Sequence, residues 1–319
     1  MKRKNINNLS LFLLFFGITA FLFSCKKDKD ATSSNTITDV VVNGANFSTL
    51  ESAVVKASLQ TTLSGAGPFT VFAPDDAAFT ASGITSSVLN SLTPSQVQSI
   101  LLYHTLNSKI LAANVPAGPN AKVTTASGDS VFVTKNASGV FINGIQVSTA
   151  DVSADNGVIH VIGRVLNPPV GNIVETAVAS KLDSLVKAVT RATTAPGGDP
   201  TLASTLSTAT LTVFAPTNAA FTQLLSALSL TDINQIPVAT LVAVLKYHVV
   251  SGRAFSSDLA NGALPMIAGG NSTINLTNGT GGGPTILGNG NGGVKSNITG
   301  TNIVCRNGVV HLIDRVILP

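Results

Sequence analysis

Residues 70–80 read TVFAPDDAAFT, and residues 212–222 read TVFAPTNAAFT, so the two stretches agree at nine of 11 positions. Two further phrases recur in the same order: LLYH (101–104) returns as LKYH (245–248), and NGVIHVIGRVL (156–166) returns as NGVVHLIDRVI (307–317). The separation between matching phrases grows from 142 to 144 to 151 residues along the chain. A growing separation indicates one duplicated segment whose second copy gained loop insertions.

The duplication divides this chain of 319 residues into two predicted domains, at 39–169 and 170–319. The stretch NPPVGN (167–172) lies at their boundary, where Pro and Gly interrupt regular structure. The largest insertion in the second copy is the Gly- and Asn-rich stretch 278–293. This composition predicts a disordered loop unless the stretch forms a tight turn between strands. No strand–glycine–helix pattern follows it, which disfavours a phosphate-binding role.

The phrase TVFAP predicts a short buried strand that ends at its proline, because proline cannot donate to a strand ladder. A helix follows in each copy. Asp75 and Asp76 in the first copy, and Thr217 and Asn218 in the second, can cap its first turn. The paired aspartates also suggest acid–base or metal chemistry, but Thr and Asn replace them in the other copy, so capping is the favoured interpretation. The motif residues predicted to be structural are Phe72, Pro74, Phe79, Phe214, Pro216 and Phe221.

The two tyrosines of the chain each precede a histidine at the end of a predicted helix: Tyr103–His104 and Tyr247–His248. The first of these helices begins with a capping-box pattern at Thr93. The apolar residues before each histidine recur at helical spacing, which predicts that the histidine lies on the buried stripe. Two interpretations of the tyrosines stay open. They lie near a surface that partners touch, or they belong to the core and their hydroxyl groups satisfy a loop carbonyl.

The phrase NGV-H predicts the last hairpin of each domain, because Asn-Gly is a strong turn signal and a β-branched strand follows. His160 and His311 lie among aliphatic residues in this strand. We interpret each as a core histidine that holds a neighbouring loop through one ring nitrogen. Cys305 aligns with Ala154 of the other copy, which predicts a small buried apolar residue rather than a reactive thiol.

The three phrases together resemble the repeated segments of the fasciclin-like domain, and the resemblance covers both halves of the chain. It implies an α+β fold of two tandem domains, each a wedge of two β-sheets flanked by short helices. It also implies an adhesion module of extracellular and envelope proteins with no shared catalytic activity. The family's Tyr-His segment has been connected with adhesive contacts. Carried over to this chain, that role falls on Tyr103, His104, Tyr247 and His248.

The N-terminus predicts export. A basic start and the apolar stretch LFLLFFGITAFLF lead to LFSC, which is similar to a bacterial lipobox whose cysteine, Cys25, receives lipid. An ordinary secretory signal or an uncleaved anchor is the alternative. Residues 26–38 form a predicted polar tether. The Lys at position 26 is compatible with sorting to the outer membrane, and the run KKDKD loosely resembles signals that send lipoproteins to the cell exterior.

Composition narrows the function classes. The net charge of +4 comes from the N-terminal segment, because residues 31–319 carry 13 basic and 13 acidic side chains and no basic stripe for nucleic acid. The repeated histidines leave an envelope hydrolase or a metal-binding protein as the alternative function. The favoured prediction is a non-catalytic adhesion or ligand-binding module without cofactor or metal, which makes weak multivalent contacts. Its partner is an extracellular protein, a glycan or a second copy of itself.

Overall fold

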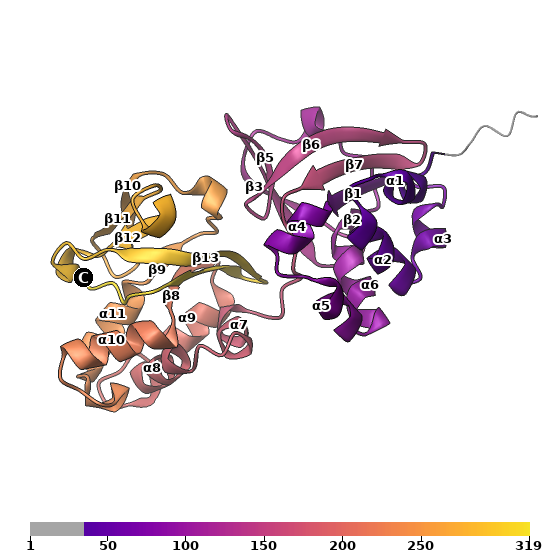
Figure 1. Cartoon of the computed structure of the whole chain (residues 1–319). Helices are drawn as coiled ribbons and strands as arrows, with labels where there is room; N and C mark the ends of the chain where they lie inside the picture. The colour runs from indigo at the N-terminus through magenta and orange to yellow at the C-terminus, as the bar shows by residue number, and fades with distance from the viewer. Residues whose placement is uncertain (1–34) are drawn as a thin grey trace, which may run out of the picture. The chain divides into compact units, whose positions relative to one another are not determined.

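The computed structural model describes residues 35–319, which form one compact unit (Figure 1). The predicted signal segment, Cys25 and residues 26–34 of the predicted tether lie outside the described residues. The tether was predicted to extend to residue 38, but a helix begins at Ile37. Thr36 caps this helix in a capping box with Asp39, and this local pattern turns the end of the polar segment into ordered structure.

The first repeat contains short helices followed by seven strands. The helices are α1 (Ile37–Asn43), α2 (Ser48–Lys56), α3 (Gln60–Leu63), α4 (Asp76–Ala81), α5 (Ser86–Ser91), α6 (Pro94–Tyr103) and the 3-10 turn η1 (Ala112–Asn114). The strands are β1 (Phe69–Pro74), β2 (Thr105–Leu106), β3 (Gly118–Thr124), β4 (Ser130–Asn136), β5 (Gly139–Ile142), β6 (Ile145–Ala154) and β7 (Gly157–Ile162).

The second repeat follows the same plan. Its helices are α7 (Ile173–Ala179), α8 (Asp183–Thr194), α9 (Leu202–Thr208), α10 (Asn218–Ala227), α11 (Val238–Lys246) and the turns η2 (Ile233–Gln235), η3 (Ser256–Asp258), η4 (Thr280–Gly282) and η5 (Asn289–Asn291). Its strands are β8 (Leu211–Pro216), β9 (Val249–Ser251), β10 (Gly262–Pro265), β11 (Asn271–Asn275), β12 (Thr285–Leu287), β13 (Ser296–Cys305) and β14 (Gly308–Ile313). In Figure 1, β8, β9 and β13 lie between helices α8, α10 and α11 on one side and strands β10–β12 on the other.

Each repeat has one mixed sheet of seven strands, with the orders β2-β1-β7-β6-β5-β4-β3 and β10-β11-β12-β13-β14-β8-β9. β1 pairs in parallel with β7, and β8 pairs in parallel with β14. The long strands β6 and β13 connect the two halves of their sheets, and each contains two register shifts of the β-bulge type. Bulges bend a strand and increase its twist, so the two halves form the sides of a wedge. The predicted α+β class with two tandem domains is confirmed.

The alternation along TVFAP separates two cores in each repeat. Val71 and Ala73 pack with the helices, whereas Phe72 between them packs inside the wedge. Phe214 occupies the same place in the second wedge. Successive side chains of a strand point to opposite faces, so a strand that is buried on both faces contributes to both cores.

The helix after each TVFAP is capped at its first turn, and neighbouring side chains also bond to a second helix. Asp75 accepts a hydrogen bond from the backbone of Ala78 within α4. Asp76 instead accepts from the backbone of Thr49 (2.8 Å), at the start of α2. Asn218 does the same in the second repeat by accepting from the backbone of Ser184 in α8 (2.9 Å). Asp76 and Asn218 therefore each join one helix to another. These structural roles explain the paired residues without acid–base or metal chemistry.

The Gly- and Asn-rich stretch 278–293 is ordered around a strand. It contains η4, the strand β12 and η5, and β12 pairs on both sides, with β11 and β13. The stretch is longer than a tight turn because it supplies the strand that continues the second sheet. Among residues 35–319, every helix is too short or too polar to traverse a lipid bilayer.

Candidate functional site

His104 and His248 join the end of a helix to the segment that follows the last strand of the same repeat. His104 Nδ1 donates to the carbonyl of Ile100 (2.7 Å), and Nε2 accepts from the backbone amide of Leu166 (2.9 Å). His248 makes the equivalent pair of bonds, to Val244 (2.7 Å) and from Ile317 (3.0 Å). An imidazole that donates through one nitrogen and accepts through the other is neutral.

Burial keeps these imidazoles uncharged. It lowers the pKa of His104 and of His248 to about 4, and the hydrogen bonds from Nδ1 to the helix carbonyls oppose this shift only in part. Burial likewise lowers the pKa of His311 to about 4. Charging a group away from water is costly, and no carboxylate pairs with His104 or His248 to offset that cost. At neutral pH these three side chains act as structural connectors.

His160 and His311 hold the loop that follows the short strand after each Tyr-His pair. His160 Nε2 donates to the carbonyl of Ile110 (2.8 Å), and His311 Nε2 donates to the carbonyl of Ala254 (2.9 Å). Each imidazole stacks on the phenylalanine of the parallel neighbouring strand, with ring centroids 5.9 Å apart at Phe72 and 5.4 Å apart at Phe214. This stacking, which follows from the parallel pairing of the two strands, was not predicted from the sequence.

Tyr103 and Tyr247 belong to the core, with exposed fractions of 0% and 1%. Tyr103 donates to the carbonyl of Ser130 (3.0 Å), and Tyr247 donates to the carbonyl of Asn271 (2.5 Å). Burial raises the pKa of Tyr103 to about 12. In this conformation neither ring reaches the surface, so the adhesive role of the Tyr-His segment stays a prediction.

The repeated histidines bond to the backbone of the fold. All hydrogen bonds of the four imidazoles go to backbone groups: Ile100, Leu166, Ile110, Asp151, Val244, Ile317 and Ala254. Within residues 35–319, no three His, Cys, Asp or Glu side chains come together as a metal site. Cys305 is buried as a free thiol, and its pKa is raised by burial, which opposes formation of the reactive thiolate.

The two asparagines of the Asn-Gly turns are polar staples that sequence reasoning missed. Asn307 accepts from the backbone of Ile173 (2.9 Å) and donates to the carbonyls of Leu206 (3.0 Å) and Ala209 (2.8 Å). Asn156 makes the corresponding three bonds in the first repeat. The recurrence of Asn at the same place in both copies is the available signal, and the Asn-Gly turn accounts for the same residue without a staple.

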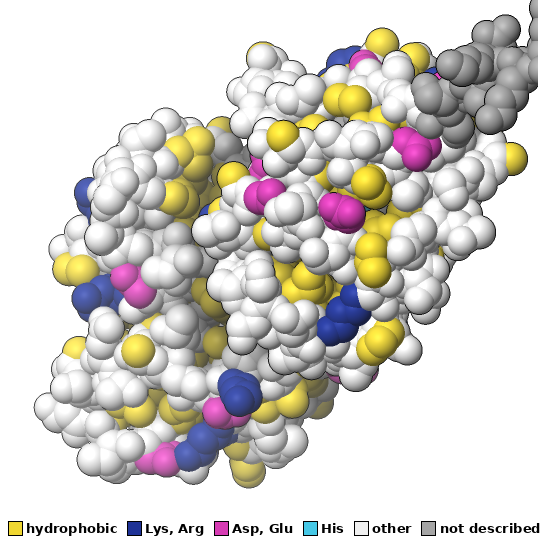
Figure 2. Space-filling model, turned by 45° about the vertical axis from the view of Figure 1, so that its right-hand side comes forward, with side chains coloured by type: hydrophobic (Ala, Val, Ile, Leu, Met, Phe, Trp, Pro, Cys, Tyr) yellow, Lys and Arg dark blue, Asp and Glu magenta, His cyan; other side chains and the backbone are white. Residues whose placement is uncertain are grey.

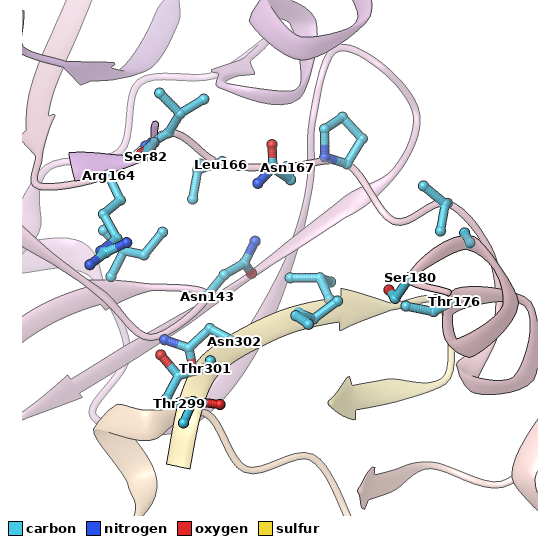
Figure 3. A pocket seen from close by; sticks show the side chains of 18 of the residues that line it. Ser82, Asn143, Arg164, Leu166, Asn167, Thr176, Ser180, Thr299, Thr301 and Asn302 are labelled. Carbon is cyan, nitrogen blue, oxygen red and sulfur yellow. The ribbon is translucent and has the colours of Figure 1, made fainter. Parts of the chain in front are cut away.

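A cleft with a volume of about 620 Å³ has a lining of mixed polar and apolar residues; we call it the polar cleft after its hydroxyl and amide groups (Figure 3). Both repeats line this cleft. The side chains labelled in Figure 3 are Ser82, Asn143, Arg164, Leu166 and Asn167 from the first repeat and Thr176, Ser180, Thr299, Thr301 and Asn302 from the second. Most of these labelled side chains carry a hydroxyl or amide group, and Arg164 is the one charged residue of the lining. The rest of the lining is apolar.

The two repeats also contact each other directly. The guanidinium carbon of Arg253 lies 3.9 Å from the ring centroid of Phe132, which also packs against Phe255. Asn302 lies against Gly144, where an added Cβ would come within 2.6 Å of its amide nitrogen. On the face shown in Figure 2, charged side chains are few and scattered. The lining of the cleft therefore offers hydroxyl and amide groups beside apolar ones and carries a single cation, Arg164.

A family model described as "Fasciclin domain" matches residues 45–168 and 184–319. Protein sll1483 of Synechocystis sp. is 41% identical over 139 residues, which are 43% of this chain and 76% of that protein. Transforming growth factor-beta-induced protein ig-h3 of Sus scrofa is 34% identical over 136 residues, but the match spans only 19% of that protein and 42% of this chain. A solved FAS1 domain pair from the insect cell adhesion molecule Fasciclin I aligns with 88% of this chain and 96% of its own, with 17% identity and a TM-score of 0.39.

Proposed function

Because this chain belongs to the fasciclin domain family, we propose that it is a non-catalytic adhesion module that binds an extracellular protein. Fasciclin domains are typically adhesion or ligand-binding modules. One observation carries the proposal: the repeated His, Tyr and Asn side chains make their bonds inside the fold, whereas the polar cleft between the repeats leaves side chains exposed. Ligand binding therefore falls to the cleft.

The cleft suits an uncharged polar segment of a protein ligand. Arg164, Asn167 and Thr301 are exposed at its walls and offer donors as well as acceptors. Individual hydrogen bonds at an exposed surface contribute little net free energy, so single contacts of this kind are weak. Two or more copies on one surface would raise the effective concentration and make the adhesion firm. A glycan and a second copy of the chain are the other ligands to be tested.

We further propose that lipid on Cys25 anchors the chain to the bacterial outer membrane. The support is the LFSC sequence at 22–25 and the Lys at position 26. The polar residues after Cys25 would then hold the folded unit away from the bilayer. Firm anchoring needs more than one acyl chain, which fits the diacylated type of modification.

The test is a screen of the chain from residue 26 onward against arrays of extracellular proteins and glycans. Each ligand found is measured again with the double variant Asn167→Ala/Thr301→Ala, which removes two side chains of the cleft. We expect binding to fall about tenfold or more, as the loss of two hydrogen bonds implies. The control variant Gln98→Ala/Gln223→Ala changes exposed residues of α6 and α10 and should bind normally. Equal loss in both variants, or in neither, would exclude the cleft as the binding site.

A further inference from the structure

A second cavity, with a volume of about 190 Å³, lies inside the wedge of the first repeat. The stacked pair Phe72 and His160 forms part of its wall. Most of the remaining wall is aliphatic and includes Leu106, Val115, Val133, Val140, Ile142 and Val147. An apolar space of this kind favours apolar ligands.

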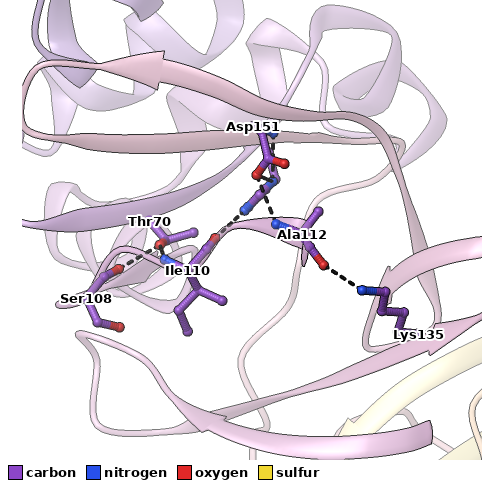
Figure 4. A network of polar contacts seen from close by, with 7 residues as sticks. Thr70, Ser108, Ile110, Ala112, Lys135 and Asp151 are labelled. Atoms are coloured by element: carbon purple, nitrogen blue, oxygen red, sulfur yellow. Dashed lines mark hydrogen bonds and ion pairs between the residues drawn. The ribbon is translucent and has the colours of Figure 1, made fainter. Parts of the chain in front are cut away.

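The loop 107–117 lines one side of this cavity, and Thr70 of β1 fixes the beginning of the loop (Figure 4). The Thr70 hydroxyl donates to the carbonyl of Ser108 (2.6 Å) and accepts from the backbone amide of Ile110 (2.9 Å). The carbonyl of Ile110 in turn accepts from His160. The residues on both sides of Lys109 are therefore held in place.

The middle of the same loop is fixed by two charged side chains, which Figure 4 also shows. The backbone amide of Ala112 donates to the Asp151 carboxylate (2.9 Å), and its carbonyl accepts from the Lys135 ammonium (3.0 Å). The cavity thus has a preformed wall on this side, which lowers the entropy cost of binding a ligand.

Lys109 provides a positive charge at the cavity. Its side chain lines the cavity and is exposed to solvent, so it lies at the opening. Within residues 35–319 the ion pairs involve other side chains, and Lys109 makes no hydrogen bond of its own. Lys109 and Lys135 next to the single carboxylate of Asp151 leave a positive local balance.

The second repeat has a cation at the matching position but uses it differently. Arg253 precedes Ala254, whose carbonyl accepts from His311 as that of Ile110 accepts from His160. The guanidinium group of Arg253 donates to the carbonyls of Cys305, Arg306 and Gly308 and lies over Phe132. Arg253 is therefore occupied by contacts within the fold, whereas the ammonium group of Lys109 in the first repeat is not.

We propose that this cavity binds a small monocarboxylate with an apolar tail of about six to eight carbon atoms. The size follows from cavities of about 150 Å³, which accept a benzene ring. The tail would fill the aliphatic space beside the loop, and the carboxylate would meet the Lys109 ammonium at the opening. The site is separate from the polar cleft, so it is independent of the adhesive function.

The test titrates octanoate into the chain from residue 26 onward and follows binding by calorimetry. We expect one saturable site per chain, with affinity about fivefold lower in Lys109→Gln, as for an exposed ion pair. The matched control is Lys122→Gln. Lys122 is exposed between Ala121 and Val123, which line the cavity, so its side chain points to the other face of β3. Its loss should leave the affinity unchanged.

A second variant, Ala121→Leu, fills the cavity and should abolish binding, and circular dichroism checks that it folds. If it does not fold, Val140→Leu replaces it in the same test. Absence of octanoate binding would overturn the proposal, as would equal affinities in wild type, Lys109→Gln and the filled variant. Octan-1-ol that binds as tightly as octanoate would exclude the role of Lys109. Binding of palmitate but not octanoate would exclude the proposed size.

Discussion

Acid should destabilise this protein between pH 6.5 and 4, and His248→Gln should weaken that dependence. Burial lowers the pKa of His104, His248 and His311 to about 4 in the folded state, whereas an unfolded chain binds these protons near pH 6.5. In that window the unfolded state holds more protons than the folded state. The contribution of these histidines to the free energy of unfolding is therefore fully present above pH 6.5 and is lost as the pH falls toward 4.

The size of the effect follows from the pKa shifts. A difference of roughly 2.5 pKa units corresponds to about 3 kcal/mol for each histidine over the whole window. The free energy of unfolding should change by up to about 1.4 kcal/mol per pH unit for each one. His248→Gln removes one of the three histidines. The free energy of unfolding of this variant should therefore change less steeply with pH, by up to about 1.4 kcal/mol per pH unit. The aspartates with lowered pKa, such as Asp199 beside Lys246, respond at lower pH and do not confuse the measurement.

The assay is urea unfolding at pH 7.5, 6.5, 5.5 and 4.5, followed by circular dichroism. Asn307→Ala is the matched control, because it breaks core hydrogen bonds of the second repeat without removing a titratable group. It should lower the free energy of unfolding at every pH by a similar amount and keep the wild-type slope. A wild-type free energy that does not change between pH 6.5 and 4.5, or equal slopes in wild type and His248→Gln, would refute the reasoning.

Three further predictions concern substitutions of individual side chains. Asn307→Ala should lower the free energy of unfolding by about 2–4 kcal/mol, because it leaves up to three backbone groups without their partner; chemical denaturation at pH 7.5 checks this, and a loss below 0.5 kcal/mol would contradict the staple role. Tyr103→Phe/Tyr247→Phe should cost about 1 kcal/mol per hydroxyl and leave adhesion unchanged, since the rings stay buried; a loss of adhesion in a folded variant would instead support the adhesive segment. Cys25→Ala should release the protein from the membrane into the soluble fraction on cell fractionation, and a variant that stays fully membrane-bound would disprove the lipid anchor.

The local sequence determined the repeated elements. TVFAP and the residues after it specify a strand, a stop and a capped helix, and Asn-Gly specifies the hairpin before the last strand. The capping box at Thr93 is present in the structure. These features depend on backbone preferences and hydrogen bonds within a few residues, which a single sequence displays directly. The duplication doubled the signal, because a feature present in both copies reports on the fold.

Only the tertiary structure decided where the polar side chains of these motifs go. The hydrogen bond from Leu166 to His104 joins residues 62 positions apart, and that from Asn307 to Leu206 joins residues 101 positions apart. No local pattern encodes such a partner, since it depends on the parallel pairing of β1 with β7 in the first repeat and of β8 with β14 in the second. For the same reason helical spacing predicted that His104 is buried but did not decide whether Tyr103 is buried or exposed. Both are buried, and Tyr103 packs inside the wedge. Residues beyond the helix cover the face that the spacing alone would leave exposed.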